Sequence, residues 1–290
     1  MFQIGAWDFA GGMIVHESAG FAALASLWML GPREKQNANP HSIPMVVIGT
    51  SILWFGWFGF NGGSALAIGG LATIAFVNTQ IAPAVAMVTW MALDWLFMGK
   101  PTIMGACAGA VTGLVVITPS AGFVQPGFAM VAGVMGGVVC WTMTYIIKNK
   151  TNLDDTCDTV GVHGTGGFLG TILVGVLSDP ECCLNAETAP EWCANPGTVI
   201  RSWNQFKIRT ICAVVSAVYS IIVTYCILKA ILTFWQKPLL TDKQQATARD
   251  EYAFGEEAYK IAGVKNSPQS SVHYFPMVNG TNSNNNSTKR

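Results

Sequence analysis

Charged side chains are scarce in this chain. Lysine, arginine, aspartate and glutamate together make up 11% of its 290 residues, whereas an ordinary soluble domain carries about 25%. Hydrophobic residues make up 51%, and the mean hydropathy is +0.41. These proportions exclude a typical soluble domain and predict an integral membrane protein embedded in a lipid bilayer.

The chain also lacks an excess of charge of either sign. Sixteen basic residues balance sixteen acidic ones, and the basic residues are scattered instead of forming a stripe. This distribution argues against nucleic acid as a partner. The sequence shows neither a pair of nucleophile and base nor a metal-binding cluster, so we expect no enzyme, no metal and no other cofactor.

Seven apolar stretches are long enough to cross about 30 Å of hydrocarbon, which takes roughly 20 residues each. Short polar breaks such as MGKP and KNKTNLDD separate most of them, as in a compact helical bundle. The expected spans cover residues 9–30, 43–62, 72–98, 103–121, 127–147, 160–177 and 208–234. We therefore predict an all-α polytopic membrane region over 1–236.

Residues 237–290 differ in composition from the rest of the chain. They are polar and end in VNGTNSNNNSTKR, which has too little apolar surface to fold alone. We expect a cytosolic, largely disordered tail. The glycosylation triplets that begin at Asn279, Asn285 and Asn286 would then remain unmodified.

Lysine and arginine in the short loops set the expected orientation. If the spans alternate, one side of the membrane holds Arg33, Lys35, Lys100, Lys148 and Lys150. That side should be cytoplasmic, which places the N-terminus outside and the C-terminus in the cytosol, with the plasma membrane as the expected location.

The loop expected outside carries three cysteines. Cys182, Cys183 and Cys193 could form a disulfide there, or remain free thiols. Glycine pairs occur within the apolar spans, at Gly133 and Gly137 and at Gly166 and Gly170. This spacing predicts close helix packing in lipid and says nothing of a substrate.

Histidine is rare, yet two of the four histidines lie within apolar stretches. His16 occurs in DFAGGMIVHESAG and His163 in DTVGVHGTGGFLG, and aspartates precede them at Asp8 and Asp158. Imidazole is costly in lipid and is typical of functional sites there, so the pair indicates a pore that handles protons. The alternative is that both are packing histidines, bonded to neighbouring carbonyl groups.

Five segments along the chain resemble successive segments of the ammonium transporter (Amt/Mep/Rh) family, in its Amt branch. They are DFAGGMIVHESAG, LWFGWFGFNGGSALA, AFVNT, GACAGAVTGLVVITPSAGFV and DDTCDTVGVHGTGGFLGTILVGVLS, in this order. The resemblance implies an eleven-helix homotrimer with a narrow apolar pore in each subunit. This chain resembles helices five to eleven, so the N-terminal part is missing and we expect a fragment of a full transporter.

The resemblance assigns a role in transport to seven residues. His16 and His163 correspond to twin histidines that relay a proton of ammonium at the pore centre. Phe60 resembles a phenylalanine that closes the outer mouth, Ser64 a hydroxyl that helps to recruit ammonium, and Trp57 a pore-lining tryptophan. Asp8 resembles a carboxylate that orders the outer site, and Asp158 is expected to support the inner end. The aromatic residues could also be simple core or interfacial side chains.

Two acidic residues and the tail depart from the family pattern or stand outside it. Glu17, directly after His16, is expected at a helix contact or in a polar crevice, and Asp94 at a solvated membrane interface. GEEAY at 255–259 resembles the family's terminal motif, but the triplet before it reads Ala248, Arg249 and Asp250, so docking of the tail and of a cytosolic regulator is in doubt. Two hypotheses compete with transport. The chain could be an ammonium sensor, or an inert subunit that assembles with full-length copies and impairs their pores.

Overall fold

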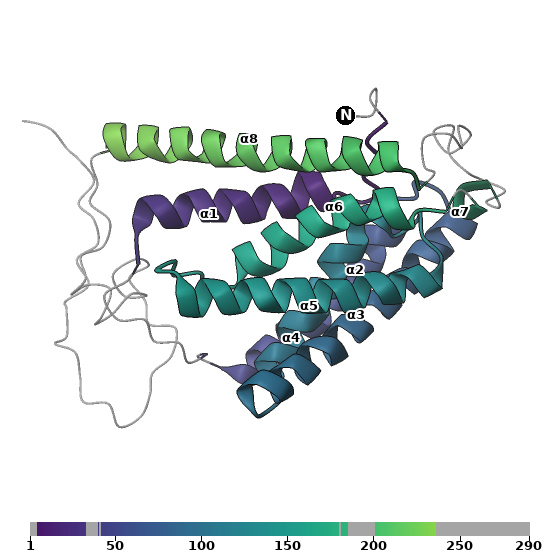
Figure 1. Cartoon of the computed structure of the whole chain (residues 1–290), viewed down its shortest axis with the longest axis horizontal. Coiled ribbons are helices and arrows are strands. Elements are labelled where there is room, and N and C mark those ends of the chain that lie inside the picture. The colour runs from purple at the N-terminus through teal and green to yellow at the C-terminus, as the bar shows by residue number, and fades with distance from the viewer. Residues whose placement is uncertain (1–4, 33–39, 41, 180, 185–200, 236–290) are drawn as a thin grey trace, which may run out of the picture. The chain divides into compact units, whose positions relative to one another are not determined.

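The computed structural model describes residues 5–32, 40, 42–179, 181–184 and 201–235. In these ranges every regular element is a helix, and seven helical segments are long and apolar enough to cross a membrane (Figure 1). The expected all-α fold and its seven spans are therefore confirmed. The tail from residue 236 onward and the loop residues 33–39 lie outside the described residues.

Two spans begin with a π-helical turn that continues directly into an α-helix. The turn η2 (Gly12–Glu17) leads into α1 (Ser18–Leu30), and η4 (Val160–Gly164) leads into α6 (Thr165–Leu177). The other elements are α2 (Ile43–Gly63), α3 (Gly70–Met98), α4 (Ile103–Ile117), the 3-10 turn η3 (Thr118–Ser120), α5 (Pro126–Lys150), the short α7 (Glu181–Leu184) and α8 (Trp203–Trp235). The two π-helical turns carry His16, which is buried, and His163, which is partly buried.

Side-chain caps define where two of the spans begin. The Ser42 hydroxyl accepts a hydrogen bond from the backbone N–H of Met45 at the start of α2, and the Thr102 hydroxyl accepts one from Gly105 at the start of α4. Each cap satisfies an N–H group that has no partner within its own helix.

Glycines let α3, α4 and α5 approach closely. A Cβ atom on Gly113 of α4 would lie 2.4 Å from the Cα of Pro83 in α3, and one on Gly133 of α5 would lie 2.6 Å from the carbonyl oxygen of Ala82. On α6, a Cβ atom on Gly170 would lie 2.5 Å from the carbonyl oxygen of Val116. The close packing expected from the glycine pairs is therefore present.

The sequence-based placement of Asp94 was wrong. Its side chain is buried and accepts hydrogen bonds from the indole Nε1 of Trp141 at 2.8 Å and from the hydroxyl of Thr102 at 2.9 Å. It therefore ties the end of α3 to α5 and to the start of α4. These partners are distant in sequence or beyond a turn, so its position near the end of an apolar stretch suggested exposure.

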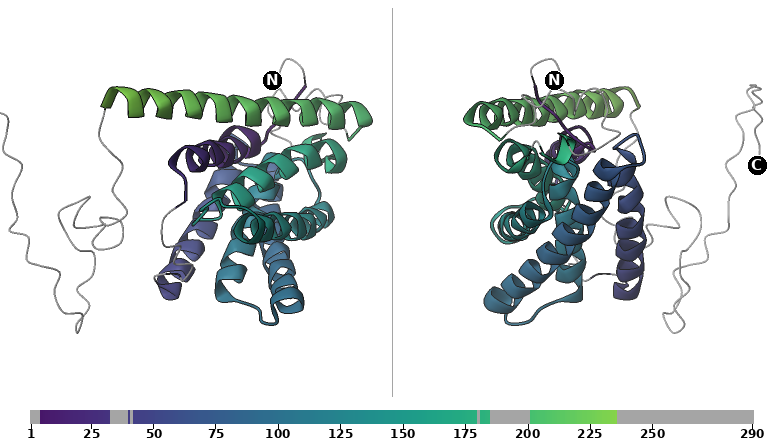
Figure 2. Two further views of the ribbon diagram at one scale, coloured as in Figure 1. Left: turned by 60° about the vertical axis from the view of Figure 1, so that its left-hand side comes forward. Right: turned by 90° about the vertical axis from the view of Figure 1, so that its right-hand side faces the viewer.

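Helix α8 lies beside α1 and α6, and it begins earlier than hydropathy predicted (Figures 1 and 2). The expected span started at residue 208, whereas α8 starts at Trp203 and so includes Lys207. The side chain of Arg209 is 1% exposed inside the bundle. Charged residues lowered the hydropathy of this segment without interrupting its backbone hydrogen bonds.

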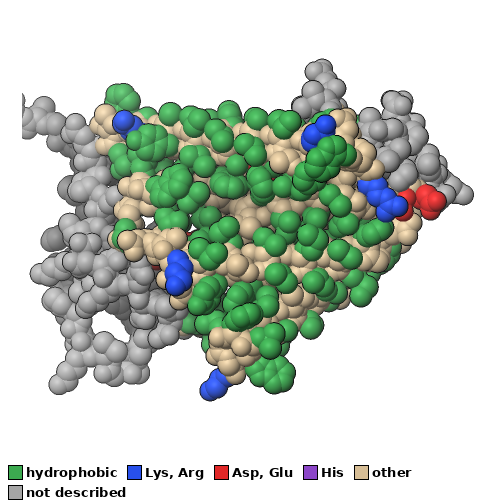
Figure 3. Space-filling view, viewed as in Figure 1, with side chains coloured by type: hydrophobic (Ala, Val, Ile, Leu, Met, Phe, Trp, Pro, Cys, Tyr) green, Lys and Arg blue, Asp and Glu red, His purple; other side chains and the backbone are tan. Residues whose placement is uncertain are grey.

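The outer surface of the helices is predominantly apolar. Large side chains such as Phe55, Phe97 and Phe234 are exposed, and lysine and arginine gather toward the two ends of the visible face (Figure 3). This pattern is typical of a surface that contacts lipid. In α7, the Cys182 thiol is free and buried, which for this residue agrees with the free-thiol alternative. The side chain of Cys183 and all of Cys193 lie outside the described residues.

Candidate functional site

Two histidine rings from different spans meet inside the bundle. The Nδ1 atoms of His16 and His163 lie 3.3 Å apart, and their ring centroids are separated by 5.4 Å. For this contact to be a hydrogen bond, one ring carries a proton on Nδ1 and the other presents a lone pair. The Nε2 atom of His16 is buried and has no hydrogen-bond partner among the described residues. The pair therefore has the geometry to pass a proton from ring to ring.

Asp8 organises the turn that carries His16. Its carboxylate accepts hydrogen bonds from the backbone N–H groups of Gly11 at 3.1 Å, Gly12 at 2.7 Å, Met13 at 2.9 Å and Ile14 at 3.3 Å. Burial raises the pKa of Asp8, and these four hydrogen bonds act in the opposite direction. A carboxylate at this place also complements the partial positive charge of the helix start.

Asp155 has the same position relative to His163. Its carboxylate accepts hydrogen bonds from the N–H groups of Thr159 at 2.9 Å and Val160 at 2.8 Å, at the start of η4. Sequence reasoning missed this residue. The signal was present, because the same number of residues separates Asp8 from His16 and Asp155 from His163.

Asp158, the aspartate that the resemblance singled out, makes a different contact. It pairs with the ammonium group of Lys148 at 2.7 Å, at the end of α5, and its backbone has a φ of 55°. Burial raises the pKa of Asp158, and Lys148 opposes this shift. Asp158 therefore anchors the loop before η4 to α5.

Two aromatic side chains of α2 pack on His16. The ring of Trp57 stacks on it with a centroid separation of 4.9 Å and an angle of 16°, and the ring of Phe60 lies 5.9 Å away. The indole Nε1 of Trp57 donates a hydrogen bond to the Thr118 hydroxyl at 2.9 Å. Trp57 is buried whereas Phe60 is 40% exposed, so the cluster extends from the interior toward an open face.

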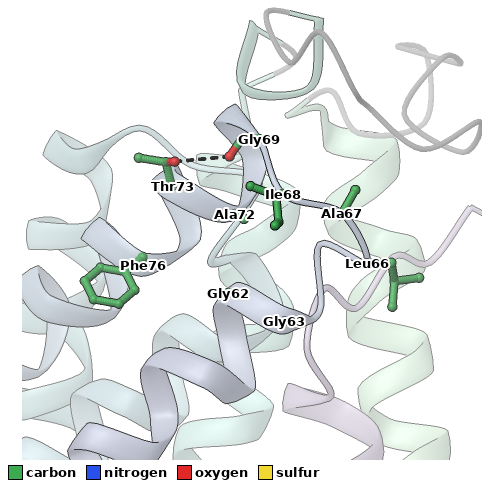
Figure 4. Close-up of a pocket in the computed structure, with 9 residues that line it drawn as sticks. All are labelled: Gly62, Gly63, Leu66, Ala67, Ile68, Gly69, Ala72, Thr73 and Phe76. Carbon is green, nitrogen blue, oxygen red and sulfur yellow. Dashed lines mark hydrogen bonds between the residues drawn. The ribbon is translucent and has the colours of Figure 1, made fainter.

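Ser64 lies one turn beyond Phe60, and its hydroxyl donates a hydrogen bond to the carbonyl oxygen of Phe60 at 2.9 Å. Beside it, between the end of α2 and the start of α3, is a cavity of about 490 Å³ (Figure 4). Its lining is mainly apolar, with Leu66, Ile68 and Phe76 as the large side chains. No charged group lines it, so it offers little to an ion.

Comparison with known proteins decides the family. The sequence profile described as the Ammonium Transporter Family matches residues 1–259. This chain belongs to the Ammonium Transporter Family. Membership agrees with the seven apolar spans and with the resemblance of the five sequence segments.

Several curated members of the Ammonium Transporter Family are similar in sequence. An ammonium transporter of Bacillus subtilis is 38% identical over 260 residues, which cover 89% of this chain and 62% of the relative. The ammonium transporter Amt1 of Archaeoglobus fulgidus is 49% identical over 183 residues, which cover 62% of this chain and 46% of the relative. The chain thus spans about half to three fifths of the length of these relatives.

Solved structures of the family share the fold. The crystal structure of Mep2 from Candida albicans matches with a TM-score of 0.73 and 33% identity, over 88% of this chain and 59% of that one. A structure described as a sensor Amt protein matches with a TM-score of 0.73 and 25% identity, over 84% of this chain and 59% of that one.

Proposed function

We propose that this chain forms part of a transmembrane pathway for ammonium or ammonia, in which His16 and His163 exchange a proton. The observation that carries the proposal is the 3.3 Å contact between the two Nδ1 atoms, made by rings from separate spans. Membership of the Ammonium Transporter Family supports ammonium as the substrate.

The energetics of the ion explain why histidines suit such a pathway. An ammonium ion that enters an apolar pore must shed its water, at a cost of several kcal/mol, whereas neutral ammonia crosses at lower cost. If an N–H bond of ammonium breaks and its proton moves to a free ring nitrogen of the histidine pair, the ammonium ion becomes neutral ammonia. The ammonia molecule then continues through the pore. Potassium has a similar size but carries no proton to give up, so chemistry and not size would separate the two.

The aromatic residues would act before this step. Trp57 and Phe60 flank His16, and their faces would attract a cation by about 1 to 2 kcal/mol when it is partly desolvated. The Ser64 hydroxyl lies one turn beyond Phe60, directly after the end of α2, and would recruit ammonium there. In this proposal Asp8 and Asp155 fix the two turns, and Asp158 supports the inner end through Lys148.

Assembly and orientation are part of the same proposal. We place the N-terminus outside and the C-terminus in the cytosol of the plasma membrane, with residues 1–236 as the membrane region and 237–290 as the tail. A homotrimer follows from the family resemblance, and a cytosolic regulator would meet the tail. Because the chain spans only part of its relatives' length, the proposal covers only the part of the pathway that residues 1–236 form.

The test is ammonium uptake by lipid vesicles that contain the full chain, followed with a pH-sensitive dye inside. Replacing His16 or His163 with alanine should lower the uptake rate more than tenfold, because each variant removes one of the two rings. His273→Ala, in the polar tail, is the control and should have no effect. Uptake by His16→Ala equal to that of the original chain would contradict the proposal, and uptake no faster than in empty vesicles would show that this chain alone does not transport.

A further inference from the structure

Another buried carboxyl follows His16 directly in the chain. Glu17 is the last residue of η2, and its side chain is 0% exposed. Successive residues of a helix point in directions about 100° apart, and Glu17 is directed toward α6 and α8, while His16 packs on α2. The hydroxyls of Thr171 on α6 and Ser216 on α8 and the backbone of Ala217 on α8 approach its carboxyl.

Neither oxygen of Glu17 has a hydrogen-bond partner among the described residues. The titratable groups near Glu17 are Asp8, which precedes the same turn, Cys212 on α8, and His16, its neighbour in the chain. The guanidinium of Arg209 on α8 lies near Asp8 and Cys212. Asp8 has four N–H donors and the guanidinium of Arg209 to balance a charge. Among the described residues no cation pairs with Glu17, and the Ser216 hydroxyl and Ala217 backbone near its carboxyl complete no hydrogen bond to it. An unpaired carboxylate in a low-dielectric interior costs far more than a neutral acid.

The hydroxyl of Thr171 indicates which form of Glu17 fits. It donates its proton to the carbonyl oxygen of Gly167 at 2.8 Å, within α6. Toward Glu17 it therefore presents lone pairs, which repel a carboxylate but can accept a hydrogen bond from a carboxylic acid.

We propose that Glu17 is a proton-binding site in the bundle, carried as the neutral acid with its O–H directed to Thr171, and that it positions His16. The second part rests on the proposed function of the histidine pair. Helix α6 lies directly on the η2 backbone, since a Cβ atom on Gly167 would lie 2.6 Å from the backbone nitrogen of Glu17. Loss of the proton would place a charge in this contact, separate η2 from α6 and shift the neighbouring His16 ring relative to His163.

Infrared spectroscopy of the full chain in lipid vesicles tests the protonation directly. The original chain should show a carboxylic acid C=O band that shifts on exchange into D2O. Glu17→Gln should remove this band, because the amide mimics the shape of the acid without its O–H. Glu181→Gln, which removes an exposed carboxyl, is the control and should leave the band unchanged. Thr171→Val should move the acid band to higher frequency, because the hydrogen bond to the hydroxyl is lost.

The absence of an acid band, or a band that persists in Glu17→Gln, would overturn the proposal. If Glu17→Gln does not fold, Thr171→Val replaces it as the test. A carboxylic acid band at the same frequency in Thr171→Val as in the original chain would also overturn the proposal. The positioning part is read from the ring signals of isotope-labelled His16 in NMR spectra: they should shift at high pH in the original chain and not in Glu17→Gln, and an identical shift in both would overturn that part. Neither measurement needs transport, so failure of the uptake assay would count against the histidine pathway alone.

Discussion

At the scale of single residues, the site depends on carboxylates and an indole that are hydrogen-bonded to neighbouring groups. The carboxylate oxygens of Asp8 and Asp155 accept hydrogen bonds from backbone N–H groups of the two π-helical turns. These bonds stabilise the turns without direct contact between the carboxylates and the histidine rings. Trp57 is fixed in turn by the Thr118 hydroxyl. The residues that position the rings of His16 and His163 are thus held by hydrogen bonds of their own, and the proposed proton transfer would not require them to move.

We expect Asp8→Asn to lower the free energy of unfolding by about 2 kcal/mol, because hydrogen bonds to a charged acceptor are worth about 1.5 to 3 kcal/mol. The amide keeps one oxygen acceptor, but its NH2 group would face the N–H groups of Met13 and Ile14. Chemical denaturation in detergent measures the change. Glu181→Gln, at an exposed site, is the control, and equal stability of the two variants would show that Asp8 does not hold the turn.

Trp57→Phe tests the tie between α2 and η3. The variant keeps an aromatic ring against His16 but loses the 2.9 Å hydrogen bond to Thr118, which should cost about 1 kcal/mol. Trp57→Ala also leaves a cavity and should cost about 3 to 5 kcal/mol. Thermal unfolding followed by circular dichroism compares both with Trp203→Phe, whose indole is 71% exposed and whose loss should be near zero. A similar loss in Trp57→Phe and Trp203→Phe would refute the role of the hydrogen bond.

At the scale of the helices, sequence reasoning succeeded where one local property decides the structure. Long apolar runs predicted all seven spans, and glycine spacing predicted the close contacts of α5 and α6. It failed where the partner is remote. The burial of Asp94 depends on Trp141 of α5, and Asp155 was passed over because Asp158 lies closer to His163 in the chain. The early start of α8 was missed because charge lowers hydropathy but does not end a helix.

The contact of α3 with α4 makes a direct prediction. Gly113→Ala adds a methyl group 2.4 Å from the Cα of Pro83, so the two helices must separate. Overpacking of this kind costs about 1 to 3 kcal/mol. Gly127→Ala is the matched control, because a Cβ atom there meets nothing within 4 Å. Chemical denaturation should show a loss for Gly113→Ala only, and equal stability of both variants would contradict the packing described.

At the scale of the whole molecule, the mainly apolar outer surface indicates that the helices lie in a bilayer. The orientation of the protein in that bilayer is predicted from the positions of lysine and arginine near the helix ends. Lys148 and Lys150 end α5, and the loop that follows contains Asp158 and an exposed cysteine, Cys157. In the proposed orientation this loop is cytosolic.

Cys157 reports the orientation without any new cysteine. A membrane-impermeant maleimide should label it in inside-out vesicles and not in intact cells, as read by mass spectrometry of the peptide that contains it. Cys157→Ala identifies the signal, and lysis of the cells with detergent should make the site reactive. Labelling of Cys157 in intact cells would contradict the proposed topology and indicate that the C-terminus lies outside.

The Nδ1 contact of the histidines has a consequence for direction. Suppose that His16 carries its proton on Nδ1 and His163 carries its proton on Nε2. A proton that arrives at Nε2 of His16 drives the shared one across to Nδ1 of His163, which then releases its own from Nε2. Both tautomers are now inverted, so the pair is set to pass the next proton backwards. In the proposed pathway, repeated proton transfer in one direction would therefore require both rings to return to their first tautomers between turnovers. Until then, the tautomers of the pair would record the direction of the last transfer.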